Sequence, residues 1–216
     1  MEQEIFKKYL LLEKLNVSRE TFSDFESFVS MITEKNKEIN IISKKTAENE
    51  SIRGRHIVDS AQVIDFIDLN SNTTVDLGTG AGLPGIVIAI IMKNLKKNMK
   101  FILYEKSYHK SLFLKEVSRK LNLDTEIVQK DVFKNKNLET GTIMARAFKP
   151  LPIVLDLVFK NFKSYKNIIL FMGKNGQNIL SKTLKEWDFE YMEKKSLTSE
   201  DSFLLNIKNI KKKFLN

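Results

Sequence analysis

Apolar side chains recur every three or four positions through most of residues 1–70. This period is typical of amphipathic helices, and Ser18 is well suited to cap one of them. We therefore interpret residues 1–70 as a helical N-terminal extension. The segments expected in it are a helix over 2–15, a helix after Ser18 that includes Phe22 to Ile32, a polar loop over 36–50 and a helix over about 51–67.

From Thr73 onward, short apolar runs alternate with segments of helical spacing. Strands separated by helices of this length predict parallel βαβ units in an open, doubly wound α/β sheet. We interpret residues 71–216 as this core, within a single domain overall. Runs at 189–192 and 203–207 predict an antiparallel hairpin, and the basic tail over 208–213 is expected to fray. The remaining strands are expected at 74–77, 101–105, 126–130, 142–146 and 167–172, with helices from Pro84, Ser107, Leu151 and Gln177.

A glycine-rich loop follows the first predicted strand, which ends in Val75-Asp76-Leu77. Gly78, Gly80 and Gly82 stand at alternate positions, followed by Pro84-Gly85 and an apolar helix. Glycine serves where the backbone needs positive φ or must approach a ligand closely. The N-terminus of the following helix points free N–H groups at that ligand. The loop therefore predicts a nucleotide-type cofactor site.

Two cofactor classes fit this loop. Gly80, Gly82 and Gly85 match the G-x-G-x-x-G fingerprint of dinucleotide-binding proteins. Gly78, Gly80 and Gly82, preceded by Asp76, match the motif of S-adenosylmethionine methyltransferases instead. The Asp76 carboxylate favours the second class, because it can orient the loop and face the methionine ammonium but would repel a pyrophosphate. We therefore expect S-adenosylmethionine.

Two further strand ends supply candidate nucleoside contacts. Glu105 follows the second strand, where an acid can accept both ribose hydroxyls, although it fits either cofactor class. It can also be an acid favoured at a helix start by the dipole. Val132 and Phe133 follow the third strand and are expected to pack on an adenine and read its edge with their backbone. Ordinary loop packing is the alternative for this pair.

Composition and charge narrow the classes of protein. The 216 residues carry a formal net charge of +9, which favours phosphate-rich partners, although a lysine excess can also be solvated surface. There is no cysteine, so disulfides, thiolate metal sites and cysteine nucleophiles are excluded. The two histidines and the carboxylates show no metal-ligand spacing. No apolar run reaches the ~20 residues that span a bilayer, and the N-terminus lacks a signal-peptide core, so a cytoplasmic protein without a membrane partner is expected.

Three segments together resemble a known family. They are residues 56–60 (His-Ile-Val-Asp-Ser), residues 76–86 around the glycine loop and residues 144–148 (Met-Ala-Arg-Ala-Phe). In this order and spacing they resemble the ribosomal RNA small subunit methyltransferase G family, also called the glucose-inhibited division protein B family. The likeness runs from about residue 36 to 174.

The resemblance implies a class I, Rossmann-like methyltransferase with a mostly parallel seven-stranded sheet and helices on both faces. It implies that S-adenosylmethionine methylates N7 of a guanine in 16S ribosomal RNA near the decoding centre. The partner would then be 16S ribosomal RNA or the small ribosomal subunit, and we expect a monomer. By position, the family's cofactor contacts fall on Gly78, Leu83, Val132-Phe133 and Arg146, and its lysine after the fifth strand on Lys174.

Three positions depart from the family's usual pattern. Ile41-Ile42 replace a common Leu-Thr pair, and Glu105-Lys106 replace an Asp-Ser pair. Phe133 stands where the family commonly has an acid, which removes any carboxylate contact there but leaves the backbone contact possible. None of these departures changes the glycine loop or Arg146.

The implied chemistry needs alignment and no general base. Guanine N7 is a lone pair with no proton to lose. Holding N7, the methyl carbon and sulfur in line can supply about 7–11 kcal/mol of barrier reduction. Methylation of pyrimidine C5 usually needs a cysteine, and amine methylation an Asn/Asp-Pro-Pro-aromatic motif, and the chain has neither. A small-molecule or protein methyltransferase, or a non-catalytic RNA-binding protein that retains a cofactor site, are the alternatives.

Arg146 is the candidate for the reaction itself. At a strand end it can contact the methionine carboxylate or guide the guanine, and a salt bridge at the sheet edge is the alternative. The candidate RNA contacts are Arg53, Arg55, His56 and Lys174, although His56 on a helix can equally be a structural hydrogen bonder. Further basic candidates are the loop 93–100, Lys106, Lys110 and the C-terminal lysines.

Overall fold

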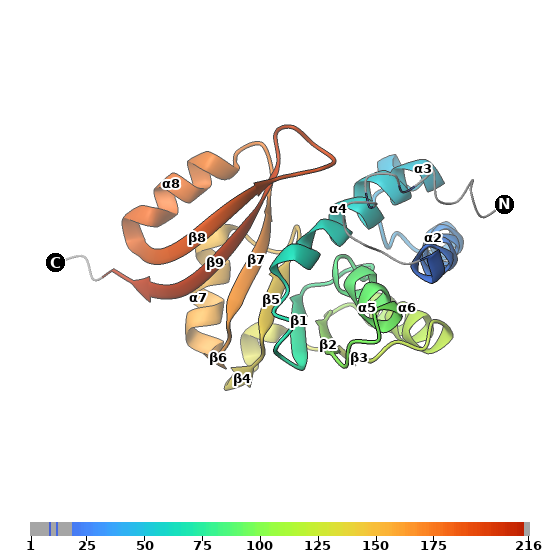
Figure 1. Ribbon diagram of the computed structural model, residues 1–216, viewed down its shortest axis with the longest axis horizontal. Helices are drawn as coiled ribbons and strands as arrows, with labels where there is room; N and C mark the ends of the chain where they lie inside the picture. The colour runs from blue at the N-terminus through green and yellow to red at the C-terminus, as the bar shows by residue number, and fades with distance from the viewer. Residues whose placement is uncertain (1–8, 10–11, 13–18, 214–216) are drawn as a thin grey trace.

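The computed structural model describes residues 9, 12 and 19–213, and its centre is a seven-stranded sheet (Figure 1). The strand order is β3-β2-β1-β5-β7-β9-β8. The strands are β1 (Thr73–Leu77), β2 (Lys100–Tyr104), β3 (Thr125–Val128), β5 (Thr142–Ala145), β7 (Asn167–Met172), β8 (Trp187–Lys195) and β9 (Phe203–Lys212).

Five of these strands run parallel to one another, and β9 enters antiparallel to β7. β8 and β9 form the predicted hairpin, in which β9 lies between β7 and β8. The mostly parallel seven-stranded α/β sheet is thus confirmed. β1 pairs with β2 on one side and with β5 on the other. The first three strands therefore extend the sheet to one side of β1, and the later strands extend it to the other side.

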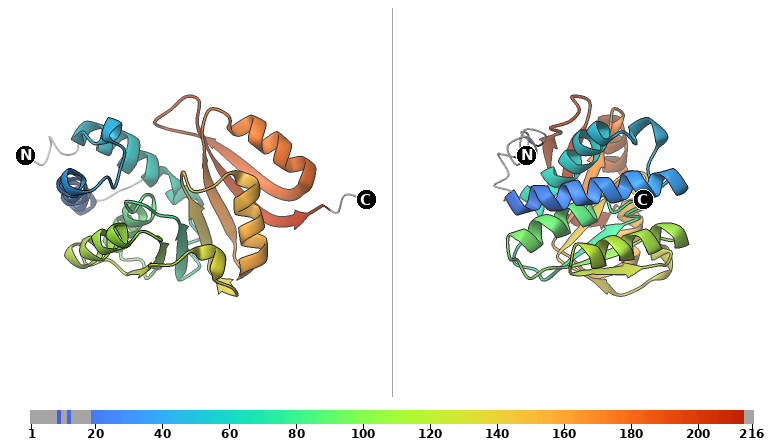
Figure 2. Two further views of the ribbon diagram at one scale, coloured as in Figure 1. Left: turned by 180° about the vertical axis from the view of Figure 1, so that it is seen from behind. Right: turned by 90° about the vertical axis from the view of Figure 1, so that its right-hand side faces the viewer.

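Helices cover both faces of the sheet, because successive strand side chains point to opposite faces. Phe101, Leu103, Met144 and Ile169 belong to one hydrophobic cluster, and their sequence neighbours belong to the other. Figures 1 and 2 show the two groups of helices on either side of the sheet. The first group contains α2 (Arg19–Glu38), α5 (Gly85–Asn94) and α6 (Tyr108–Lys120), and the second contains α7 (Leu151–Asn161) and α8 (Gly176–Glu186).

The N-terminal extension shares the core of the first face. α2 packs on α5 and α6, and α5 is buried almost all round, as its continuous apolar sequence predicts. The helix expected over 2–15 lies outside the described residues except for Tyr9 and Leu12, which are fully buried. Tyr9 stacks on Phe22, with ring centroids 5.3 Å apart. Ser18, the expected N-cap, also lies outside the described part.

Residues 36–50 are not a simple loop. α2 continues to Glu38, and the Asn36 side chain accepts hydrogen bonds from the backbone N–H groups of Ile41 and Ile42, which are buried. This side-chain cap lets the chain reverse without exposing apolar residues. Short helical turns follow at η2 (Lys44–Thr46) and α3 (Asn49–Ser51).

The helix expected over 51–67 is continuous but changes its pitch. It passes through η3, α4 and η4, and η3 is a seven-residue π-helix. Such wide turns are rare and often occur at functional sites. Their bounds are η3 (Ile52–Val58), α4 (Asp59–Ala61) and η4 (Gln62–Phe66).

Two further features differ from the sequence prediction. β4 (Leu138–Glu139) and β6 (Phe162–Ser164) form a small parallel sheet that was not expected. The basic tail was expected to fray, but Lys208 to Lys212 continue β9, because they pair with the start of β8. In the described part of the chain, no helix has the length and apolar character needed to cross a membrane.

Candidate functional site

The parallel strands end at one edge of the sheet, where ligands bind in open α/β folds. Gly78 follows β1, Glu105 follows β2, Arg146 follows β5 and Gly173 follows β7. β1 leads into α5 on one face, and β5 leads into α7 on the other. The edge between β1 and β5 is therefore the point at which a cleft can open between the two layers.

The glycine loop has the conformation that its sequence predicts. Gly78, Gly80 and Gly82 have φ of 67°, 61° and 93°. At Gly78 an added Cβ would lie 2.3 Å from Cδ2 of Phe148, whereas at Gly80 it would meet only a backbone oxygen at 3.9 Å. Gly80 thus keeps the backbone open to a ligand. Leu83 belongs to the core and supports the loop from beneath, with its N–H donating to the Thr79 carbonyl at 3.0 Å.

Asp76 holds this loop from inside. Its Oδ2 accepts hydrogen bonds from Thr79 Oγ1 at 2.6 Å and from the Gly85 N–H at 2.8 Å. The side chain is fully buried, and this burial raises the pKa of Asp76 to about 6. Its Oδ1 has no hydrogen-bond partner among the described residues. The expectation that Asp76 orients the loop is met, but its carboxylate faces the loop backbone and is not open to an ammonium group in this conformation.

Glu105 connects the glycine loop to the next strand end. Its Oε2 accepts from the Gly80 N–H at 3.0 Å, and its Oε1 accepts from the Ser107 N–H at 2.7 Å. The bond to Ser107, the N-cap of α6, agrees with the helix-start alternative. The bond to Gly80 places the carboxylate at the mouth of the loop, where a ribose contact is also available.

A cleft of about 310 Å³ opens beside these groups. Gly78 and Glu105 form one side, and Val132, Phe133 and Phe148 form apolar walls. The Phe133 and Phe148 rings are stacked, with centroids 6.0 Å apart. A bare glycine backbone, one carboxylate and flat apolar walls match the three parts of an adenosyl cofactor, so the residues present fit S-adenosylmethionine.

The sequence did not reveal how the Val132-Phe133 segment is held. Asn161, the last residue of α7, donates through Nδ2 to the carbonyls of Val132, Phe133 and Asn135, at 3.3, 3.0 and 2.5 Å. Asp131 Oδ1 accepts from the Phe133 N–H at 3.1 Å. The Phe133 backbone is therefore engaged by the protein, which leaves its ring as the surface it offers a base. No sequence signal marks Asn161, because its partners lie 26 to 29 positions away.

Arg146 points into the N-terminal extension. It donates to His56 Nδ1 at 2.7 Å, to Ser60 Oγ at 3.0 Å and to the Arg55 carbonyl at 3.2 Å. Its Nε also lies 3.6 Å from Asp59 Oδ2. The sheet-edge salt bridge is therefore present, and a direct contact with the cofactor or guanine would have to replace part of this network.

His56 is neutral in this network. Burial and the neighbouring arginines Arg146 and Arg55 lower the pKa of His56 to about 4. Because the guanidinium of Arg146 can only donate, Nδ1 must be the acceptor and Nε2 carries the proton. Nε2 then donates to Thr46 Oγ1 at 3.0 Å. His56 is thus a structural hydrogen-bonding residue here, which is the alternative role that the sequence left open for it.

The candidate RNA contacts separate into different environments. Arg53 is buried and forms two 2.7 Å hydrogen bonds with Glu26, so the expectation of a phosphate contact for Arg53 is corrected. The ion pair joins residues 27 positions apart, which the sequence could not indicate. Arg55 and Lys174 are exposed at the site edge of the sheet.

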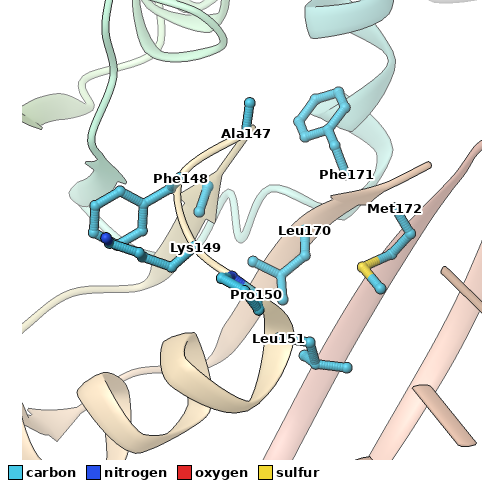
Figure 3. A pocket seen from close by; sticks show the side chains of 9 residues that line it. Ala147, Phe148, Lys149, Pro150, Leu151, Leu170, Phe171 and Met172 are labelled. Carbon is cyan, nitrogen blue, oxygen red and sulfur yellow. The ribbon is translucent and has the colours of Figure 1, made fainter. Parts of the chain in front are cut away.

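Two more cavities adjoin the cofactor-type cleft at Ala147. The smaller, about 250 Å³, is lined mainly by residues with apolar side chains and lies at the start of α7 (Figure 3). The larger, about 570 Å³, lies between Arg146, His56 and the loop that joins β8 to β9. Ala147 lines all three spaces and has φ of 50°, and Figure 3 shows it between Phe148 and Phe171. The cleft and both cavities therefore lie next to one another at this residue.

Comparison with known proteins gives the same family along nearly the whole chain. A family model described as rRNA small subunit methyltransferase G matches residues 21–206. The ribosomal RNA small subunit methyltransferase G of Pelagibacter ubique (strain HTCC1062) is 63% identical over 211 residues, which cover 98% of this chain and 99% of the relative. That of Orientia tsutsugamushi (strain Ikeda) is 34% identical and covers 89% and 93%.

The fold has solved counterparts as well. An S-adenosylmethionine-dependent methyltransferase from Aquifex aeolicus superposes with a TM-score of 0.54 at 13% identity, and the match covers 81% of this chain and 97% of that one. At this identity the likeness shows the Rossmann-like fold alone. Together, the family model, the near-complete relatives and the shared fold confirm the resemblance seen in the three sequence segments: the chain belongs to the rRNA small subunit methyltransferase G family.

Proposed function

We propose that this protein transfers the methyl group of S-adenosylmethionine to N7 of a guanine in 16S ribosomal RNA, near the decoding centre. The family supports the reaction and its substrate class. The single structural observation that carries the proposal is the junction at Ala147, where a cleft suited to an adenosyl cofactor meets a larger polar cavity. Donor and acceptor molecules can thereby face each other across one residue.

The cofactor would be held by the glycine loop and the two adjacent strand ends. The open backbone at Gly80, next to the closely packed Gly78, would receive the methionine part, and Glu105 would accept ribose hydroxyls. Val132 and Phe133 would pack on the adenine. Leu83 and Asp76 would act from beneath by holding the loop. When bound, S-adenosylmethionine supplies an electrophilic methyl group, which is the chemistry that the protein side chains lack.

The protein's own contribution is to position the base and exclude water. N7 has no proton that must be removed, so no general base is needed. His56 is neutral and therefore adds no second positive charge beside Arg146. Arg146, held by His56, Ser60 and Asp59, keeps the N-terminal extension against the end of β5. We propose that Arg146 affects transfer mainly through this alignment, since proximity and orientation dominate a reaction of this kind.

The RNA is proposed to lie across the site edge of the sheet, and the protein to act as a monomer in the cytoplasm. Phosphate contacts by basic side chains supply affinity without sequence choice. The part of β9 after Ile207 lies at the edge of the sheet opposite the site, because Ile207 pairs with Ile168 at the start of β7. The exposed basic residues of the site edge are Arg55, Lys106, Lys130, Lys149 and Lys174.

A transfer experiment tests the function. The protein is incubated with methyl-labelled S-adenosylmethionine and either unmethylated small subunits, naked 16S ribosomal RNA, total protein or a metabolite extract. Label is expected in RNA as 7-methylguanosine at one position. Tight cofactor binding without any transfer to RNA would overturn the proposal, and label in protein or metabolites would favour the alternative methyltransferase classes.

A further inference from the structure

The polar cavity beside the cofactor-type cleft has a wall built by two distant parts of the chain. The loop between β8 and β9 reaches towards α4 in Figure 1 and closes the cavity opposite the end of β5. Asp59 and Gln62 contribute from the N-terminal extension, and Thr198 contributes from the loop. A cavity of about 570 Å³ that combines carboxylate, amide and hydroxyl groups with apolar side chains suits a planar ligand with polar edges.

Asp59 is fixed in this wall through one of its two oxygens. Its Oδ1 accepts from Gln62 Nε2 at 2.7 Å and from Thr198 Oγ1 at 2.9 Å. Gln62 is fully buried and also accepts the Leu197 N–H at 3.0 Å, and Ser196 Oγ lies 3.4 Å from the same Asp59 oxygen. We call Gln62, Ser196 and Thr198 the latch. It ties the loop to the extension and sets the orientation of the carboxylate.

The other oxygen of Asp59 remains available. Within the described part of the chain, Oδ2 accepts no hydrogen bond, and its nearest cation is Arg146 Nε at 3.6 Å. A carboxylate has about four acceptor positions, so Oδ2 can take two donors from a ligand. The latch therefore presents Asp59 Oδ2, whose one close partner among the described residues is Arg146, to a cavity that shares Ala147 with the cleft.

The chemistry of guanine fits this acceptor. N7 and O6 lie on one edge of the base, whereas N1–H and the N2 amino group lie on the Watson–Crick edge, away from N7. If N7 faces the cleft at Ala147, the Watson–Crick edge points to the far wall, where both of its donors need acceptors. Phe171, half-buried in the same cavity, has the guanidinium carbon of Arg146 5.7 Å from its ring centroid and offers the rest of its ring to a base. Adenine presents no such pair of donors on that edge.

We propose that this cavity receives the target guanine and that Asp59 Oδ2 reads its Watson–Crick donors, with the latch as a set of positioning residues. The inference rests on the proposed function. It assigns the choice of guanine to a carboxylate of the extension and to a loop some 137 positions away. The base must leave its stack to place its Watson–Crick edge against this wall.

The test compares guanosine with inosine, which lacks only the N2 amino group, at the methylated position of reconstituted small subunits. Transfer rates and cofactor affinity are measured for the wild type and for Asp59→Asn, Thr198→Val and Thr198→Ser. The wild type should prefer guanosine by roughly tenfold or more, as the loss of a hydrogen bond to a charged group predicts. Asp59→Asn and Thr198→Val should reduce this preference to about threefold or less with cofactor affinity unchanged, while Thr198→Ser should retain it.

Asp65→Asn provides a matched control, because Asp65 of the extension pairs with Lys194 of β8 and neither residue lines the cavity. It should keep the wild-type preference. An Asp59→Asn variant that transfers to guanosine and inosine in the wild-type ratio would overturn the pocket assignment alone. A wild type that binds the cofactor but methylates no RNA would overturn the proposed function, and the assignment with it. Thermal melting and cofactor binding identify any variant that fails to fold, in which case the Thr198 pair decides the outcome.

Discussion

At the residue scale, the glycine loop depends on two different properties of glycine. Gly78 needs both a positive φ and the missing Cβ, because the Phe148 ring occupies the space beside it. Gly54, inside the π-helix, has open space where a Cβ would stand and does not have a positive φ. The same residue type therefore predicts opposite responses to substitution at the two positions.

Gly78→Ala should lower the free energy of unfolding by about 1–3 kcal/mol and weaken cofactor binding, because alanine is strained at this φ and displaces Phe148. Gly54→Ala should be neutral or slightly stabilising. Chemical denaturation and titration with S-adenosylmethionine check both. Adding Phe148→Ala to Gly78→Ala should recover only the steric part of the loss, and full recovery would show that the backbone strain is negligible.

Asp76 predicts an unusual pH dependence. Burial raises its folded-state pKa to about 6 from the ordinary 3.8, so the native state binds the proton more tightly than the unfolded state. Its contribution to stability therefore falls as pH rises from about 4 to 6, by up to about 3 kcal/mol, and is constant above. Neutral His56 acts in the opposite direction, because its pKa is lowered, and its contribution is lost as pH falls from 6.5 towards 4.

In the wild type, the loss of stability that Asp76 causes as pH rises partly cancels the gain that His56 causes. In Asp76→Asn only the gain from His56 should remain. The free energy of unfolding should then rise more steeply with pH between about 4 and 6 than in the wild type. Asp156→Asn is the control, since Lys160 lowers the pKa of that half-buried carboxyl and its removal cannot steepen the rise. Denaturation curves at several pH values measure the slopes, and equal slopes in Asp76→Asn and wild type would contradict the burial argument.

At the element scale, the site consists of strand ends held by distant helices. Asn161 at the end of α7 holds the segment after β3, and the π-helix holds Arg146 after β5. In both cases one planar side chain satisfies several backbone or side-chain acceptors at once. Such many-partner contacts fix geometry more strictly than a single ion pair, so conservative changes should be costly there.

Arg146→Lys should show this cost. Lysine keeps the charge near Asp59, but it cannot reach His56, Ser60 and the Arg55 carbonyl together. We expect the free energy of unfolding to fall by about 1–3 kcal/mol, as buried acceptors lose their donors, and methyl transfer to fall more than cofactor affinity. Arg55→Lys, at an exposed neighbour in the same π-helix, is the control for stability. A stable Arg146→Lys with normal transfer would remove the alignment role.

At the scale of the whole molecule, the sheet divides the basic charge between two edges. The lysines after Ile207 in β9, and those between α5 and β2, lie at the edge opposite the cleft. The net charge of +9 is therefore not all directed at one RNA surface. The sequence alone could not separate the lysines of the two edges, because it shows all of them only as basic residues in loops or near the C-terminus.

Charge reversal at the two edges should have unequal effects. Lys106→Glu with Lys149→Glu and Lys174→Glu should weaken RNA binding and flatten its dependence on salt concentration, because fewer counterions are released. Lys97→Glu with Lys208→Glu and Lys211→Glu changes the net charge equally at the opposite edge and should alter binding much less. Filter binding at several salt concentrations measures both slopes. Equal slopes for the two triple variants would mean that the RNA does not select the site edge.

The order of the seven central strands and of the helices between them, the glycine loop and the family could all be established from the sequence. They follow from local periodicity, from backbone conformations that only glycine adopts readily, and from short motifs. Which polar groups meet became clear only from the fold. It pairs Arg53 with Glu26, directs Arg146 into the π-helix, and joins Asp59 to a loop beyond position 195. Such partners are brought together by the burial of two shared cores, and that packing leaves no local pattern in the sequence.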